Sequence, residues 1–73
     1  MRKLVVSNFP PDTTEQEIVG WFGKYGPRSV QIKSARYAIV TFGSDEEADC
    51  ALEEWQPDRV GANRRVRVRH AQF

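Results

Sequence analysis

Arginine side chains near the end of the chain have the spacing and the chemistry to bind an anionic ligand. Five arginines and no acidic residue occur from Arg59 to Phe73. Three of them, Arg65, Arg67 and Arg69, recur at every second position, so in a strand they share one face. A guanidinium binds phosphate with two parallel hydrogen bonds and also stacks on bases. The pattern favours a nucleic acid as ligand; charge that protects an edge strand from aggregation is the alternative interpretation.

The distribution of charge along the chain supports a local basic surface. The net charge is only +1, but all ten acidic residues lie in two blocks, residues 12–17 and 45–58. A local field, rather than the net charge, steers a charged ligand to one surface. We interpret both acidic blocks as solvated helix faces, and a basic partner protein remains the alternative for the second block.

The ring of Tyr37 is a second group with binding chemistry. It lies in a β-branched run of strand length, residues 35–42. Aromatic rings on the face of a sheet stack on unpaired RNA bases. The neighbouring Lys33 and Arg36 supply positive charge beside the ring. The alternative is an exposed tyrosine that only shields the sheet.

The residues needed for catalysis or for metal binding are missing from the sequence pattern. His70 has no cysteine, serine or paired carboxylate at motif spacing, and there is no glycine-rich phosphate loop. The single Cys50 excludes an internal disulfide framework and a cysteine-based zinc site. The apolar runs are far shorter than a membrane span. We therefore expect no enzyme, no cofactor and no membrane insertion.

Strands and helices alternate in an order that positions these groups. Apolar runs and alternation predict strands at residues 3–8, 29–33, 36–42 and 64–70. Thr14–Glu17 and Ser44–Glu47 fit capping boxes, which predict helices that end near Gly26-Pro27 and near Pro57. Trp21 and Trp55 have the spacing of core residues. Only two residues, at 34 and 35, are left for the loop between the middle strands.

This order resembles the RNA recognition motif (RRM) family over the whole chain. Residues 35–42 fit much of the family signature K/R-G-F/Y-G/A-F-V-x-F/Y. Tyr37, Ala38, Val40 and Phe42 match it, and Ala35, Arg36 and Ile39 do not. The shorter signature has Asn8 in place but Val5 where an aromatic residue is common. The resemblance implies an α+β, ferredoxin-like β-α-β-β-α-β fold, with two helices on one face of a four-stranded antiparallel sheet.

The resemblance also implies the strand order 4-1-3-2 and an open sheet face that binds single-stranded RNA. With Leu4 and Val6 facing the helices, we expect Val5 and Tyr37 to lie side by side on the central strands. Only Tyr37 then supplies a stacking ring, and arginine compensates in part. The predicted RNA-binding residues are Val5, Ser7, Gln31, Lys33, Arg36, Tyr37, Ile39, Arg65, Arg67, Arg69, His70 and Gln72.

We expect one domain over residues 1–73, cut from a longer protein, and a monomer in a nuclear rather than cytoplasmic location. The alternative function is that of an RRM used for protein binding, through the helical face or the aliphatic sheet. One RRM-derived family binds tryptophan-bearing peptides through an Arg-x-Phe motif, and Arg59-Val60-Gly61 lacks its phenylalanine. Phe73 is expected either to touch a base or to fold over the sheet.

Overall fold

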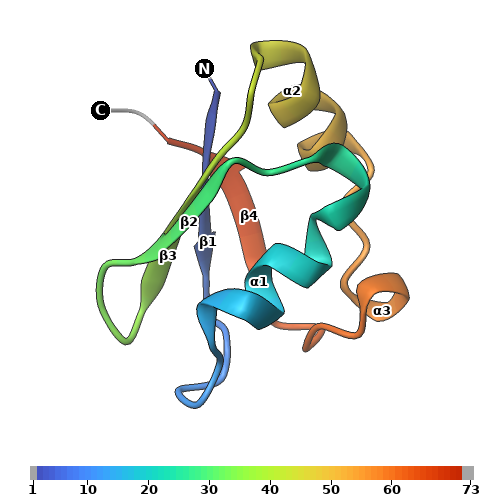
Figure 1. Ribbon diagram of the computed structural model, residues 1–73. Coiled ribbons are helices and arrows are strands. Elements are labelled where there is room, and N and C mark those ends of the chain that lie inside the picture. Colours follow the sequence, from blue (N-terminus) through green and yellow to red (C-terminus); the bar gives the residue numbers. More distant parts are fainter. Residues whose placement is uncertain (1, 72–73) are drawn as a thin grey trace.

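The computed structural model describes residues 2–71, in which one antiparallel sheet is covered on one side by helices (Figure 1). The strands are β1 (Lys3–Ser7), β2 (Ser29–Ile32), β3 (Tyr37–Thr41) and β4 (Arg67–His70). The helices are α1 (Glu15–Trp21), the 3₁₀ turn η1 (Gly23–Tyr25), α2 (Asp45–Glu53) and the short α3 (Pro57–Val60). The spatial order β2-β3-β1-β4 confirms the predicted ferredoxin-like topology, with β1 and β3 central.

The side-chain caps predicted at both helix starts are present, and the glutamates contact the cap hydroxyls rather than the cap backbone N–H groups. The backbone N–H of Glu17 donates to Thr14 Oγ1 over 3.2 Å, and the N–H of Glu47 donates to Ser44 Oγ over 3.2 Å. Each glutamate reaches back to the hydroxyl of its cap residue, at 3.4 and 3.3 Å. These contacts satisfy backbone donors that a helix start leaves unpaired. The two caps thus set where α1 begins after β1 and where α2 begins after β3.

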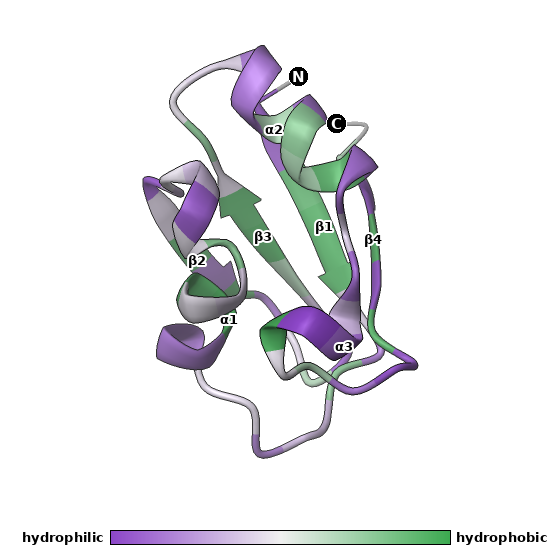
Figure 2. Cartoon of the chain, turned by 90° about the vertical axis from the view of Figure 1, so that its right-hand side faces the viewer, coloured by the Kyte–Doolittle hydropathy of each residue, from purple (hydrophilic) through white to green (hydrophobic). Residues whose placement is uncertain are grey.

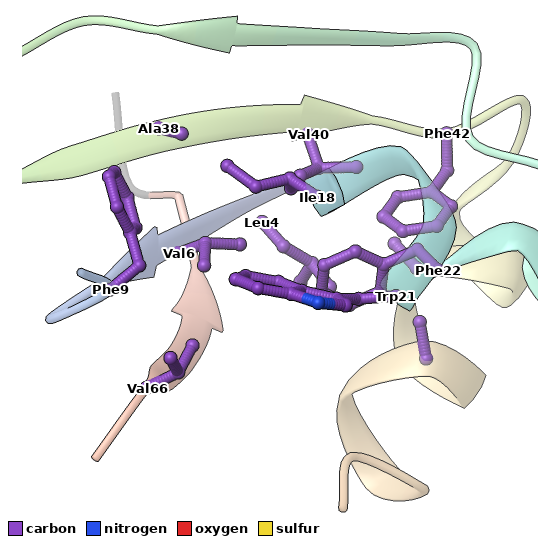
Figure 3. Close-up of a cluster of buried hydrophobic side chains, with 12 residues drawn as sticks. Leu4, Val6, Phe9, Ile18, Trp21, Phe22, Ala38, Val40, Phe42 and Val66 are labelled. Atoms are coloured by element: carbon purple, nitrogen blue, oxygen red, sulfur yellow. The ribbon is translucent and has the colours of Figure 1, made fainter. Parts of the chain in front are cut away.

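The core lies between the sheet and the helices (Figure 3). Leu4, Val6, Ala38 and Val40 enter it from the two central strands, as the alternation predicts. The ring of Phe22 packs against two aromatic rings: it lies edge-on to Phe42, with centroids 5.8 Å apart, and stacks on Trp55, with centroids 5.1 Å apart. The core role predicted for Trp21 and Trp55 is therefore confirmed.

Several predicted boundaries are wrong. The first helix stops at Trp21 and continues as η1, and Gly26, at φ 65°, closes that turn. Gly20 and Gly23 lower helix propensity in this stretch, which explains the early end. Helix α3 was not predicted; Pro57 at its first turn and Gly61 at φ 81° provide its start and stop.

The strands are also shorter than predicted. The loop between β2 and β3 has four residues instead of two, because the N–H groups of Lys33 and Ser34 both donate to the carbonyl of Tyr37. The last strand begins at Arg67, not at residue 64. Arg64 and Arg65 belong to a turn in which the N–H of Arg65 donates to Asn63 Oδ1 over 2.9 Å.

The outer edge of β2 is covered by helix α1. Glu15, in the first turn of the helix, accepts a hydrogen bond from the backbone N–H of Ile32 over 3.1 Å. An edge strand otherwise presents unpaired backbone groups. Within the described residues, no helix is long and apolar enough to cross a membrane.

Candidate nucleic-acid interface

The face of the sheet that points away from the helices is a nearly continuous polar and basic surface with a small apolar centre. Strand pairing aligns its side chains in rows across the sheet. One row runs Gln31, Ile39, Val5, Arg69. The next runs Tyr37, Ser7, Arg67, and the third runs Ser29, Thr41, Lys3. None of these described residues is acidic.

The apolar centre is recessed. Val5 and Ile39 are only 4% and 8% exposed, although neither belongs to the core cluster beneath the helices. Tyr37, by contrast, is 38% exposed and is one of two exposed large hydrophobic side chains among the described residues. Among residues 2–71, Tyr37 is therefore the one exposed aromatic ring on this face, and it lies beside two buried aliphatic side chains.

The predicted neighbour of Tyr37 is wrong. Val5 and Tyr37 do not lie side by side: the partner of Val5 on β3 is Ile39, and the partner of Tyr37 on β1 is Ser7. The reason is that antiparallel register pairs the end of β1 with the start of β3. Tyr37 therefore stands at the end of the sheet where the β2–β3 loop and the start of β4 meet.

Basic side chains lie on both sides of the two rows that contain Val5 and Tyr37. Arg67 and Arg69 are exposed and pair in register with Ser7 and Val5. Figure 2 shows the alternation of polar and apolar residues along β4. Lys33 and Arg36 are exposed beside Tyr37. Arg65 is exposed in the turn before β4 rather than in the strand, so it does not share the strand alternation of Arg67 and Arg69.

A hollow of about 450 Å³ opens at the Tyr37 end of this face, lined by Ser7, Asn8, Phe9, Ala35, Arg36 and Arg67. Asn8 joins the segments around it. Its N–H donates to the carbonyl of Arg36 over 3.4 Å, and its Nδ2 donates to the carbonyl of Arg65 over 3.0 Å. Its φ of 65° is left-handed, a conformation that a non-glycine residue adopts at some cost. The sequence prediction did not include Asn8 or this hollow.

One predicted residue, His70, does not join this surface. His70 is the last residue of β4, where the predicted strand also ends, and its Nε2 lies 3.3 Å from Asp49 Oδ1 of α2. It therefore faces the helical side, as the alternation from Arg69 requires. Gln72 and Phe73 lie outside the described residues.

The helical side carries a separate hollow of about 300 Å³ between η1, the end of α2 and α3. Trp21, Tyr25, Glu54 and Trp55 line it, and Arg59 and Val60 of the Arg-Val-Gly segment contribute from α3. The Trp55 indole N–H is buried and finds no acceptor among residues 2–71. The Tyr25 hydroxyl donates to Glu54 Oε1 over 2.9 Å, and burial together with this carboxylate raises the pKa of Tyr25.

Comparisons with known proteins agree with the fold. The RNA recognition motif family matches residues 4–67. The chain is 39% identical over 71 residues to a speckle targeted PIP5K1A-regulated poly(A) polymerase of Xenopus tropicalis, a match that covers 93% of this chain but 8% of that protein. It therefore spans a small part of that relative's length.

Two solved structures have the same fold. The RRM domain of S. pombe Puf1 has a TM-score of 0.78 and 30% identity, covering 97% of this chain and 99% of that one. An SXL-lethal protein/RNA complex has a TM-score of 0.82 and 28% identity, covering 99% of this chain and 47% of that one. Matched over most of its length by the family and by these folds, the chain belongs to the RNA recognition motif family.

Proposed function

We propose that this domain binds single-stranded RNA on its open sheet face, with a base stacked on Tyr37 and phosphates held by the arginines around it. RNA recognition motifs are binding modules in which sheet aromatics stack on unpaired bases. The observation that carries the proposal is the exposed Tyr37 ring on a described face without acidic residues. The similarity to a domain solved in a protein/RNA complex supports the ligand class.

Stacking on Tyr37 supplies affinity without a strict sequence preference. One stacked base contributes about 1–3 kcal/mol, and every base has a π face. Val5 and Ile39 are recessed and aliphatic, so they support the edge of a base or sugar rather than a full stack. We therefore propose a domain of modest intrinsic affinity, which contributes to specificity within a larger ribonucleoprotein.

Arg67 and Arg69 extend the contact beyond the ring. They lie on the edge strand next to Ser7 and Val5, so an RNA strand that crosses the sheet from Tyr37 passes over them. Guanidinium groups bond phosphates and stack on bases. Lys33, Arg36 and Arg65 add exposed positive charge at the Tyr37 end, and Gln31 offers an amide beside Ile39.

An amide chemical-shift titration with short single-stranded RNAs of different sequence tests the proposal. We expect the largest shifts at Ser7, Arg36, Tyr37, Arg67 and Arg69. Amides of α1 and α2 provide the internal control and should stay in place. RNA binding with shifts confined to the helical residues would contradict the use of the sheet face. The absence of any shift at millimolar RNA would contradict RNA binding itself.

A second candidate function is docking of a protein on the helical side. The observation in its favour is the hollow beside the buried, unpartnered Trp55 N–H. Glu53 at its border favours a peptide with a backbone carbonyl for the indole and a basic side chain for this carboxylate, whereas Glu54 already pairs with Lys24. The same titration with a lysine- and arginine-containing peptide separates the two functions, because its shifts would fall on Trp21, Glu54 and Trp55.

The cellular context is also a proposal. The frog relative is named speckle targeted, which favours a nuclear location for the protein that carries this domain. Imaging of the tagged protein tests this, and a cytoplasmic signal would contradict it. We propose that the domain is a monomer; light scattering at micromolar concentration would reveal a dimer.

A further inference from the structure

Two arginines that lie far apart in the sequence line the hollow at the Tyr37 end of the sheet. Arg36 comes from the β2–β3 loop and Arg67 from the start of β4, and both are exposed. Neither forms an ion pair with a residue between 2 and 71, whereas the nearby Arg64 Nε lies 3.1 Å from Asp58 Oδ1. Within the described part of the chain, no acidic residue lines the hollow. Its two guanidinium groups are thus available to an anion.

Neutral polar groups complete the lining. The Ser7 hydroxyl has no hydrogen-bond partner among the described residues. Asn8 uses Nδ2 for the carbonyl of Arg65, which leaves its Oδ1 available to a ligand hydroxyl. The volume of about 450 Å³ falls within the range of small-ligand sites, roughly 300–1,000 Å³, and exceeds the space that an ion alone would fill.

The position of the hollow relates it to the stacking ring. Tyr37 follows Arg36 in the chain, and strand pairing puts Ser7 between Tyr37 and Arg67. A nucleotide whose base lies on Tyr37 therefore has its sugar and phosphate within reach of the hollow. Asn8 bonds the backbones of Arg36 and Arg65, so it ties the loop and the approach to β4 to the end of β1.

We infer that this hollow is a phosphate subsite, which holds the phosphodiester next to the base stacked on Tyr37 between Arg36 and Arg67. The Ser7 hydroxyl adds a hydrogen bond to the same phosphate, and Asn8 is a positioning residue. The inference rests on the proposed function, since it names the part of the RNA that this end of the surface binds. Arg36 stands where the family signature has glycine, so the subsite is a feature of this chain.

The test compares two double variants with equal loss of charge. Arg36→Gln with Arg67→Gln alters the hollow, and Arg59→Gln with Arg64→Gln, which changes residues away from the open face, is the matched control. For single strands the slope of log affinity against log salt is about −0.7 per neutralised phosphate. We expect the hollow variant to flatten the slope by about 0.7 relative to the control and to weaken RNA binding by about tenfold, as for a lost charged hydrogen bond.

Coupling to Tyr37 tests the position of the phosphate. If base and phosphate belong to one nucleotide, adding Tyr37→Ala to the hollow variant reduces affinity by less than the product of the two separate losses. Independent losses would overturn the assignment to that nucleotide. Equal salt slopes for hollow and control variants, with RNA binding still weakened by Tyr37→Ala, would overturn the subsite and leave the proposed function standing.

Titration with small phosphate-containing ligands is the last part of the test. Uridine 5′-monophosphate should shift the amides of Ser7 and Asn8 in the wild type but not in the hollow variant, and uridine should do so in neither. Equal shifts with inorganic phosphate, together with an unchanged RNA salt slope, would show a site for free phosphate and overturn the inference. A domain that binds no RNA at any salt concentration would overturn both the inference and the proposed function.

Discussion

Val5 and Ile39 are direct partners across β1 and β3, and both are almost completely shielded from solvent on the face that points away from the helices. They occupy positions where the family commonly has stacking rings. In this chain the pair forms a low apolar floor in the middle of the sheet. Tyr37 precedes Ile39 by two residues in β3, so its exposed ring lies on the same face beside this pair.

Replacing Tyr37 by alanine should weaken RNA binding by about 1–3 kcal/mol, the contribution of one stacked base. Stability should change little, because the ring is exposed and lies outside the core cluster. Fluorescence anisotropy with a labelled short RNA measures the loss. Tyr37→Phe is the matched control and should retain most of the affinity. An unchanged dissociation constant for a folded Tyr37→Ala domain would remove the stacking claim.

Truncating the floor should affect stability even though it lies on the binding face. Ile39→Ala should lower the free energy of unfolding by about 2–5 kcal/mol, as for other buried large-to-small changes. Gln31→Ala, at its exposed neighbour in register, should stay within about 0.5 kcal/mol. Urea denaturation gives both values. A loss for Ile39→Ala as small as that of Gln31→Ala would mean that the floor does not contribute to stability.

Placing a ring at the floor should strengthen RNA binding. Val5→Tyr or Ile39→Phe adds a π face to the same side of the sheet as Tyr37, which should tighten binding by about 1 kcal/mol or more. Because both positions are recessed, the larger ring must displace neighbours, and we expect a parallel loss of stability of about 1–3 kcal/mol. Isothermal titration and urea denaturation separate the two effects. If neither folded variant binds RNA more tightly, the aliphatic pair serves another partner.

Arg67 and Arg69 should act mainly through phosphates. Replacing both by glutamine should flatten the salt dependence by about one unit or slightly more, at about 0.7 for each phosphate. All sequences should lose affinity similarly, and stability should change little, because Val66 and Val68 keep their positions. A preserved slope in a folded variant that still binds RNA would assign these arginines to edge protection. A loss confined to certain sequences would indicate contact with base edges.

Asn8 should matter through both its backbone and its side chain. Asn8→Gly keeps the left-handed φ of 65° available but loses the bond to the Arg65 carbonyl. Asn8→Ala loses the same bond and adds left-handed strain of about 1–2 kcal/mol. Thermal and urea unfolding should therefore rank the variants Asn, Gly, Ala in falling stability. An alanine variant as stable as the glycine variant would show that the backbone relaxes to a different φ.

The sequence was sufficient for the fold because its signals were local and consistent. Two capping boxes fixed the helix starts, and alternation separated Leu4 and Val6 from Val5 and Ser7. Boundaries failed where weak local preferences compete. Gly20 and Gly23 shorten α1, and the pairing of both Lys33 and Ser34 with Tyr37 lengthens the hairpin loop.

The details of the binding face depended on register, which alternation alone does not determine. Alternation predicted that Val5 and Tyr37 share a face, but only strand pairing shows that Ser7 lies opposite Tyr37. His70 was predicted to bind RNA, but it follows Arg69 in the strand, so alternation turns its side chain toward Asp49 of α2. The hollow was missed because it combines residues from three separate segments, although an asparagine directly after a strand is a signal for a left-handed turn.

The hydrogen bond from the Ile32 N–H to Glu15 makes the two edges of the sheet unequal as sites for the addition of another strand. A strand from another molecule that approached β2 would have to displace this carboxylate from the backbone. At the other edge, no helix side chain forms a hydrogen bond with the backbone of β4 within the described residues. Strand addition by a peptide, or by a second copy under crowded conditions, is therefore expected at the arginine-bearing edge, where bound RNA would compete with it.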